Sequence, residues 1–272
     1  MTDQPTLVVH QVSKRYPGRA GVQANDRVSL TVPAGQVVGL LGHNGAGKTT
    51  LVGQIVGLLR PDSGSISLAG HDAVAQPGLA RRLTSVQVQT ACALEGITPR
   101  GAIRTIGRIR GGSRAQVRAR ADQLIEALDL GPWADRPAEQ LSGGVARLTA
   151  FGMAAVVPGA LVILDEPTND VDPVRRRLLW GQIQRLAEAG TAVLLITHNV
   201  REAEQVVDRL VVLEQGQVVA AGSLAELTAD GQRDLEEAYI AICGRSPDPT
   251  AAAPDRLAEP QTAGSAGSEN RP

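Results

Sequence analysis

The sequence predicts an α/β fold with a parallel core sheet, an antiparallel β part near the N-terminus and a helical region in the middle. From residue 161 onward, short apolar runs alternate with helical patterns, which is typical of parallel strands joined by right-handed crossovers. Residues 6–16 and 27–41 are rich in β-forming residues, with a turn at 33–35. Residues 99–130 favour helix because apolar residues recur there at three- and four-residue steps, at Val117, Ala121, Leu124, Ile125 and Leu128.

The alternation in the C-terminal half can be followed element by element. The expected strands are Leu161 to Leu164, Ala192 to Ile196 and Leu210 to Leu213, and the expected helices are 173–188 and 200–206. The tail from 244 to 272 consists mainly of Pro, Ala, Ser, Gly and charged residues. It cannot bury enough apolar surface to offset its ordering entropy, so we expect it to be disordered.

Composition excludes several classes of protein. The 272 residues suffice for one large α/β domain or two small ones, and 43% of them are apolar. A net charge of −1 gives no general attraction to nucleic acid, and Cys92 and Cys243 form no metal-binding or disulfide pattern. No apolar stretch approaches the roughly 18–20 residues needed to span a bilayer, and the N-terminus lacks the features of a secretory signal.

A glycine-rich loop follows an apolar run and precedes a helical pattern. Residues 42–49 fit G-x-x-x-x-G-K-[ST], in which backbone N–H groups and the helix N-terminus surround phosphate oxygens. Lys48 is one of only two lysines, which favours a specific need for its compact ammonium group. We expect Lys48 to contact the outer phosphates and Thr49 to bind Mg²⁺. The predicted phosphate-binding residues are Gly42, His43, Asn44, Gly45, Ala46, Gly47, Lys48, Thr49 and Thr50.

Two consecutive carboxylates end the apolar strand at 161–164. Asp165 is placed to hold Mg²⁺, and Glu166 to orient and polarise an attacking water. Taken alone, the pair is equally well explained as two solvated acids after a core strand. Leu141-Ser142-Gly143-Gly144 at the start of a helix and His198 after the strand at 192–196 complete the pattern.

In this order and spacing, the motifs resemble the ATP-binding subunit of an ATP-binding cassette (ABC) transporter. The resemblance covers about residues 5–243. It implies a P-loop NTPase domain with a parallel core sheet, an N-terminal antiparallel β subdomain and a helical subdomain at about 92–155. It also implies ATP hydrolysis with Mg²⁺, a second ATP-binding subunit and an integral-membrane permease. The chain would then lie on the cytoplasmic side of the membrane, held there by the permease.

The resemblance also implies roles for single residues. Tyr16 matches the aromatic residue that stacks on adenine, and Gln89, preferred over Gln87, matches a glutamine that contacts Mg²⁺ and water. His198 matches the histidine that contacts the γ-phosphate. The remaining matches are Ser142, Gly143 and Gly144, which would bind the γ-phosphate held by the opposite subunit, and Asp172, which would lie at the dimer interface.

Two departures from the family pattern stand out. The signature continues with Val145 where the family usually has Gln, which removes one polar contact across the expected dimer. The stretch from Pro17 to Arg27 is also unusual, which leaves the position of the adenine less defined than that of the phosphates.

The helical region carries a run of arginines between Glu95 and Arg120. They form either a solvated helical face or a surface directed at the permease and the anionic leaflet, where basic residues gain about 1 kcal/mol each. Nucleic-acid binding is disfavoured because no aromatic residues lie between them. The arginines are Arg100, Arg104, Arg108, Arg110, Arg114, Arg118 and Arg120.

The family resemblance leaves three functions open. The chain most resembles the ATPase of a bacterial drug or antibiotic exporter, in particular around Gln89 and His198. The ATPase of an importer uses the same motifs. Non-transport relatives usually carry tandem cassettes or long insertions, which this chain lacks.

Overall fold

The computed structural model describes residues 5–17, 21–89, 96–228 and 231–244. Apart from Gly244, the tail predicted to be disordered lies outside the described residues. Within the described ranges, no helix combines the length and the apolar character needed to cross a bilayer.

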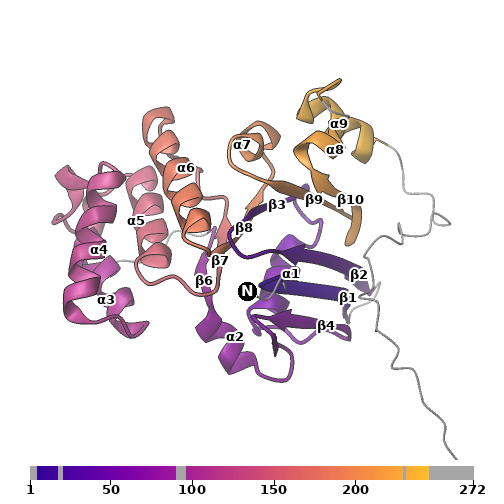
Figure 1. The fold of residues 1–272 in the computed structure, drawn as a ribbon, viewed down its shortest axis with the longest axis horizontal. Helices are drawn as coiled ribbons and strands as arrows, with labels where there is room; N and C mark the ends of the chain where they lie inside the picture. The colour runs from indigo at the N-terminus through magenta and orange to yellow at the C-terminus, as the bar shows by residue number, and fades with distance from the viewer. Residues whose placement is uncertain (1–4, 18–20, 90–95, 229–230, 245–272) are drawn as a thin grey trace, which may run out of the picture.

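A six-stranded sheet runs through the centre of the molecule in the order β10-β9-β3-β8-β7-β6 (Figure 1). All its neighbouring strands are parallel except β10, which pairs antiparallel with β9. The strands expected at 161–164 and 192–196 are adjacent to each other, and the second of them is also adjacent to the strand before the glycine loop, which confirms the predicted parallel core. Their bounds are β3 Val37–Leu41, β6 Thr84–Gln87, β7 Leu161–Asp165, β8 Ala192–Thr197, β9 Arg209–Glu214 and β10 Gln217–Ser223.

Both faces of this sheet are buried because alternate residues of each central strand enter different cores. Val193 and Leu195 of β8 pack in one core with helices, whereas Leu194 and Ile196 pack in the other with the antiparallel sheet. Strands buried on both faces carry continuous apolar runs, which is why these segments were recognisable in the sequence.

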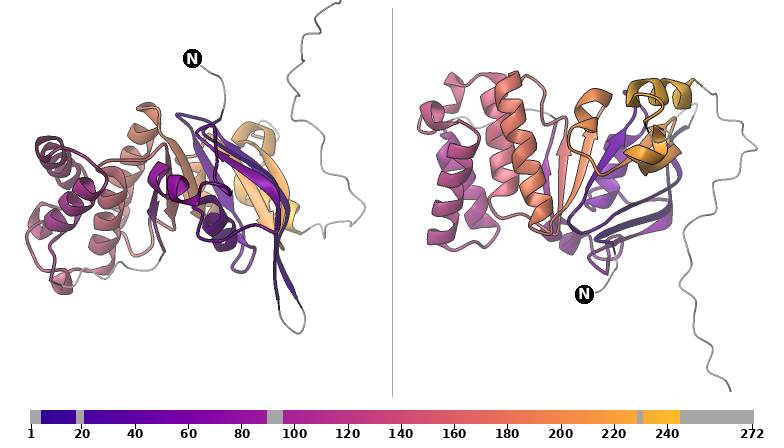
Figure 2. Two further views of the ribbon diagram at one scale, coloured as in Figure 1. Left: turned by 90° about the horizontal axis from the view of Figure 1, so that it is seen from below. Right: turned by 45° about the horizontal axis from the view of Figure 1, so that its top comes forward.

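The antiparallel sheet expected near the N-terminus is present, with the strand order β2-β1-β4-β5. Figure 2 shows it beside the central sheet, on the side away from the large helices. The second strand begins at Val22, five positions earlier than predicted. The elements of this part are β1 Leu7–Tyr16, β2 Val22–Val32, α1 Lys48–Ile55, β4 Ser63–Leu68, β5 His71–Asp72 and α2 Pro77–Leu83.

The middle of the chain forms helices that pack together at one end of the molecule (Figure 1). The stretch predicted as helical at 99–130 is two helices, because Gly111 has a φ of +88° and Ser113 begins the second one with a reciprocal capping box to Gln116. The apolar face predicted there is buried. These helices are α3 Pro99–Ile109, α4 Arg114–Ala127 and α5 Gly143–Ala155, with short 3₁₀ turns at Gly131–Trp133 and Ala138–Gln140.

The remaining helices lie along the C-terminal half. Asp172 caps the longest of them, and Pro173 occupies its first turn, where proline's missing N–H costs nothing. The helix expected at 200–206 is shorter than predicted. Their bounds are α6 Pro173–Glu188, α7 Val200–Glu204, α8 Leu224–Leu227 and α9 Leu235–Cys243.

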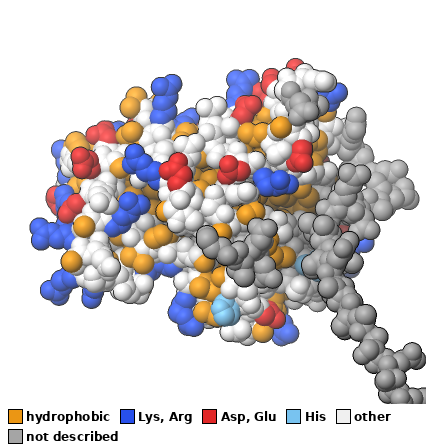
Figure 3. Space-filling model, in the orientation of Figure 1, with side chains coloured by type: hydrophobic (Ala, Val, Ile, Leu, Met, Phe, Trp, Pro, Cys, Tyr) orange, Lys and Arg blue, Asp and Glu red, His pale blue; other side chains and the backbone are white. Residues whose placement is uncertain are grey.

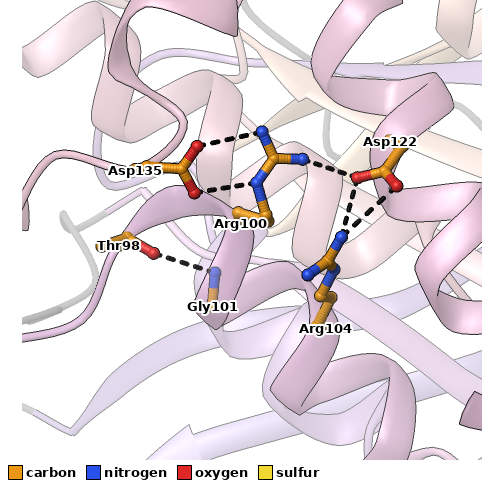
Figure 4. A network of polar contacts seen from close by, with 6 residues as sticks. All are labelled: Thr98, Arg100, Gly101, Arg104, Asp122 and Asp135. Carbon is orange, nitrogen blue, oxygen red and sulfur yellow. Dashed lines mark hydrogen bonds and ion pairs between the residues drawn. The ribbon is translucent and has the colours of Figure 1, made fainter.

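Several arginines of the basic run are used inside the protein. Arg100 binds Asp135 through Nε and Asp122 through Nη1, at 2.8 and 2.6 Å, and Arg104 shares Asp122 (Figure 4). The hydrogen bond from Arg100 holds the pKa of the Asp135 carboxyl below its usual value. Acidic side chains therefore lie among the basic ones on this end of the molecule (Figure 3).

Arg110 has an internal role as well. Its guanidinium donates to the carbonyl oxygens of Val157, Thr84 and Arg82, at 2.6, 2.8 and 3.1 Å, and so ties α3 to β6 and to the end of α5. Burial lowers the pKa of this guanidinium. Fewer arginines of the run are therefore available for a surface contact than the seven counted in the sequence. The exposed arginines of the run are Arg108, Arg114 and Arg118.

Replacing Arg110 by Met should destabilise the protein by about 2 kcal/mol, because three carbonyl groups lose a charged donor. Chemical denaturation of the purified variant measures this loss. The control is Arg118→Met on exposed α4, which should stay within about 0.5 kcal/mol of wild type. Equal stability of the two variants would contradict a structural role for Arg110.

Candidate functional site

Three strands of the central sheet end at the same edge. The parallel register pairs Leu41 with Thr197 and Asp165 with Ile196. The loops that follow β3, β7 and β8 therefore start side by side. The glycine loop, Glu166 and His198 meet at this edge, where open parallel sheets commonly bind ligands.

The glycine loop depends on close backbone contacts. A Cβ atom on Gly42 would lie 2.3 Å from the carbonyl oxygen of Leu213, and one on Gly47 would lie 2.1 Å from that of Ala24. Gly47 also has a φ of +103°, which a residue with a side chain rarely adopts. The loop thus turns the chain directly into the N-terminus of α1. Lys48 folds back over it and donates to the carbonyl oxygens of Gly42 and His43, at 2.5 and 3.0 Å.

A cavity of about 270 Å³ opens above this loop. It brings together the loop, the carboxylates after β7, and side chains from the antiparallel sheet. Tyr16 is 37% exposed at its rim, and its hydroxyl lies 3.4 Å from Oγ1 of Thr50. The lining residues are Tyr16, Val22, Ala24, Asn44, Gly45, Gly47, Lys48, Thr49, Thr50, Gln89, Asp165 and Glu166.

Burial and neighbouring charges shift the pKa values of the cavity's ionisable side chains in opposite directions. Burial lowers the pKa of the Lys48 ammonium, although the carboxylates of Glu166 and Asp165 act against this shift. Burial and the neighbouring Glu166 raise the pKa of Asp165, while Lys48 and Arg147 counteract the rise. The cavity therefore holds a partly desolvated cation beside two carboxylates, in an arrangement that added phosphate and cation charges would rebalance.

Glu166, one of the two acids that line the cavity, is buried and its carboxylate is held by contacts with Thr197 and His198. It is 4% exposed and has a φ of +48°, a strained conformation for a residue with a side chain. Its Oε2 accepts from the Thr197 hydroxyl at 3.1 Å. Its Oε1 accepts from the backbone N–H of His198 at 3.0 Å and lies 2.6 Å from Nδ1 of the same ring. His198 lies outside the cavity lining but touches it through this contact.

The two glutamines near the end of β6 lie in different surroundings. Gln87 is 1% exposed, and its Nε2 donates to the carbonyl oxygen of Arg147 at 3.3 Å. Gln89 is exposed and lines the cavity. Of the two, Gln89 alone lines the cavity, which Asp165 also lines.

Other predicted site residues lie away from the cavity lining. Ser142 caps α5 by accepting from the N–H of Val145 at 3.4 Å, and Asp172 caps α6 through the N–H groups of Val174 and Arg175. Val145 is 3% exposed and packs in the core. Within a single chain, the start of α5 therefore does not line the same cavity as the glycine loop. The predicted residues outside the lining are Gly42, His43, Ala46, Ser142, Gly143, Gly144, Asp172 and His198.

Three supporting residues were missed in the sequence. Buried Asn25 donates to the carbonyl oxygen of Gly47 at 3.2 Å, and Arg147 donates to that of Gln89 at 2.5 Å. Neither position carries a local signal, since each acts across the fold. Thr197, which binds Glu166, could have been noticed as the polar residue that ends a buried strand next to His198.

The family model described as "ABC transporter" matches residues 25–169, which include the glycine loop and both carboxylates. The chain belongs to the ABC transporter family. Among curated relatives, this ABC domain is 40% identical over 227 residues to the daunorubicin/doxorubicin resistance ATP-binding protein DrrA of Streptomyces peucetius, covering 84% of this chain and 68% of that protein. It is 36% identical over 225 residues to the doxorubicin resistance ATP-binding protein DrrA of Mycobacterium tuberculosis, covering 83% and 68%.

Solved structures show the same fold. An ATP-binding subunit of an ABC transporter superposes with a TM-score of 0.80 at 27% identity, over 88% of this chain and 99% of that one. A dimeric ATP-binding cassette, MJ0796, bound to ADP and Pi, gives a TM-score of 0.73 at 22% identity, over 80% and 98%. The predicted ABC-type α/β fold is therefore confirmed.

Replacing Gly47 by Ala should abolish ATP binding and destabilise the protein by more than about 2 kcal/mol, because it adds backbone strain to a clash with the carbonyl of Ala24. Titration with a fluorescent ATP analogue and thermal unfolding measure the two effects. Gly78→Ala in α2 is the control, since a Cβ there meets nothing within 4 Å. Normal ATP binding by the Gly47 variant would show that the loop tolerates a side chain.

Proposed function

We propose that this chain is the ATP-hydrolysing subunit of a membrane exporter for drugs or antibiotics, working with a separate permease. The observation that carries the ATPase function is the meeting of Lys48, Asp165 and Glu166 in one cavity, with His198 against Glu166. The export role rests on the 40% identity with a daunorubicin/doxorubicin resistance ATP-binding protein.

The glycine loop binds the phosphates of ATP. Its backbone N–H groups and the N-terminus of α1 supply partial positive charge. Lys48 leaves the carbonyl oxygens of Gly42 and His43 and pairs with the outer phosphates instead. Tyr16, at the rim beside Thr50, provides the aromatic surface for adenine. The phosphate-binding residues are Gly42, His43, Asn44, Gly45, Ala46, Gly47, Lys48, Thr49 and Thr50.

The oxygen ligands in the cavity fit Mg²⁺. The Thr49 hydroxyl, the Asp165 carboxylate and the Gln89 amide oxygen are the hard donors that this ion prefers, and all three residues line the cavity. Two adjacent carboxylates facing one lysine also leave negative charge that a cation would neutralise. When bound, the ion would offset the negative charge on the phosphate oxygens while the γ-phosphoryl group is transferred to water.

Glu166 orients and polarises the attacking water. Its contacts with Thr197 and His198 fix its carboxylate in one direction, so little motion is needed before reaction. His198 has its Nδ1 atom against Glu166, so Nε2 is the ring nitrogen left to bind the γ-phosphate.

Glu166→Gln should bind ATP nearly as wild type but lose hydrolysis by about 10²–10⁴-fold, the usual contribution of a general base. The amide retains an oxygen for His198, and the Thr197 hydroxyl can accept from the new NH₂ group. Lys48→Ala should instead weaken ATP binding itself. Phosphate release and nucleotide titration measure the two effects, and near-normal turnover by Glu166→Gln would remove this residue from the mechanism.

The active unit is a head-to-tail dimer. The N-terminus of α5 is exposed and lies outside the lining of the cavity in its own chain. Because the N-terminus of a helix attracts anions, it can instead bind a phosphate held by another chain. In the dimer, Ser142, Gly143 and Gly144 of one subunit would bind the γ-phosphate held by Lys48 of the other. Asp172, which caps α6, would then lie at the interface. The dimeric cassette with the same fold is consistent with this arrangement.

Mixing two inactive variants tests this dimer. Ser142→Asp keeps a good helix cap but repels phosphate, and Lys48→Ala lacks the phosphate-binding cation. Each mixed dimer retains one intact site, so random pairing should restore up to about a quarter of the wild-type rate. No recovery on mixing, or a specific activity independent of protein concentration in a proven monomer, would contradict the dimer.

Coupling to transport runs through the segment at Gln89. The permease subunit would contact this segment and the helical part, which holds the chain at the cytoplasmic side of the membrane. No nucleic-acid partner is proposed, since the basic run is partly neutralised by Asp122 and Asp135. An importer ATPase is the competing function, and it would share every ATP-binding residue.

Cells that express this chain together with the permease encoded next to it should accumulate less daunorubicin than control cells. Lys48→Ala should abolish this effect. Gln89→Ala should reduce efflux more than it reduces ATP binding, because it removes a coupling contact and one Mg²⁺ ligand but leaves the phosphate loop intact. Uptake of a substrate that depends on an external binding protein, without efflux of any compound, would identify an importer.

A further inference from the structure

Glu202 lies on α7, just beyond His198, and takes no part in the cavity lining. Its side chain is only 13% exposed, yet both carboxylate oxygens have partners. Oε2 accepts from the hydroxyl of Thr168, and Oε1 lies 2.7 Å from the guanidinium of Arg176 on α6. A nearly buried carboxylate with two partners holds both partners in place. Moving either of them away would leave the buried negative charge without a partner and with little water to solvate it.

The segment that Glu202 holds, residues 166–172, joins β7 to α6. Two of its residues, Glu166 and Asp170, have left-handed backbone conformations, with φ of +48° and +64°. Such conformations persist only where the surroundings enforce them. Glu202 does so at two places: directly through Thr168, and through Arg176, which donates to the carbonyl oxygen of Val171 at 3.0 Å.

The same helix is also connected to the carboxylate of Glu166. Asn199 caps α7 by accepting from the N–H of Glu202 at 3.2 Å, and its own N–H donates to Oγ1 of Thr197 at 3.0 Å. That hydroxyl donates to Oε2 of Glu166 at 3.1 Å. Helix α7 is therefore linked to the Glu166 side chain through Asn199 and Thr197, and to the strained backbone that follows Glu166 through Thr168 and Arg176.

The segment also limits the position of α5. A Cβ atom on Gly144 would lie 2.4 Å from the carbonyl oxygen of Asp170, so the start of α5 is in close contact with this backbone. A shift of the segment would displace both the Glu166 carboxylate and the helix start at Ser142.

We propose that Glu202 is a positioning residue for ATP hydrolysis, which acts through Thr168 and Arg176 on the segment between Glu166 and α6. This inference rests on the proposed role of Glu166. Glu202 touches neither the nucleotide nor the water. It fixes the position of the Glu166 carboxylate relative to the start of α5. Loss of its side chain therefore reduces turnover but leaves the phosphate loop intact.

Glu202→Ala in the full chain should lower turnover at saturating ATP about tenfold, a typical size for coupling through such a network, with ATP binding changed less than about twofold. Glu202→Gln, which keeps the contact with Thr168, should recover part of the rate. The matched control is Glu236→Ala, which breaks the exposed pair between Arg201 of the same helix and Glu236. The control should hydrolyse ATP at the wild-type rate.

Hydrogen exchange without nucleotide provides a second readout that needs no ATPase activity. The N–H of Val171, bound to the carbonyl oxygen of Thr168 at 3.0 Å, should exchange about tenfold faster in Glu202→Ala and unchanged in Glu236→Ala. Unchanged exchange would overturn the inference, as would a loss of ATP binding and global stability in parallel with turnover. If the wild-type chain lacks ATPase activity, the proposed function fails, and the exchange at Val171 still decides whether Glu202 holds the segment.

Discussion

The parallel register of β3, β7 and β8 places the glycine loop, Asp165, Glu166 and His198 at one edge of the sheet. Each residue along a strand advances the chain by about 3.3 Å and reverses the direction of its side chain. A one-residue slip of β7 against β8 would therefore separate Glu166 from Thr197 and His198. It would also exchange the two buried faces of the sheet, whose alternate residues pack in different cores. The register is thus enforced by burial on both faces, and the position of the proposed catalytic groups follows from it.

This constraint concentrates charge at one edge of the sheet. Lys48, Asp165 and Glu166 are brought together before any ligand binds, and burial disfavours the charged forms of Lys48 and Asp165. Lys48 meets part of this cost by binding backbone carbonyl oxygens. Thr197 and His198 donate hydrogen bonds to the Glu166 carboxylate. Lys48 and Glu166 are thus both paired within the protein, Lys48 with backbone carbonyl oxygens and Glu166 with Thr197 and His198.

The parts of the fold that were predictable are those with local causes. Strands buried on both faces carry apolar runs, and the glycine loop has a fixed spacing around Lys48, so both were visible in the sequence. Asn25 was not, because its contact with Gly47 depends on how the antiparallel sheet meets the loop. Arg110 resembled its exposed neighbours in sequence, although its guanidinium binds three distant carbonyl oxygens. Roles that depend on contacts between distant segments leave no pattern in a single sequence.

The contact between Arg175 and Trp133 gives the protein an intrinsic optical probe. The guanidinium lies 4.4 Å from the centre of the indole ring, and it also pairs with Asp129 and Asp172. The chain has only two tryptophans, and the other, Trp180, is 8% exposed within the core. A rotation of the helical part relative to α6 would separate Trp133 from its cation and change its fluorescence. Movement between the two parts of this domain can therefore be followed in solution without attaching a dye.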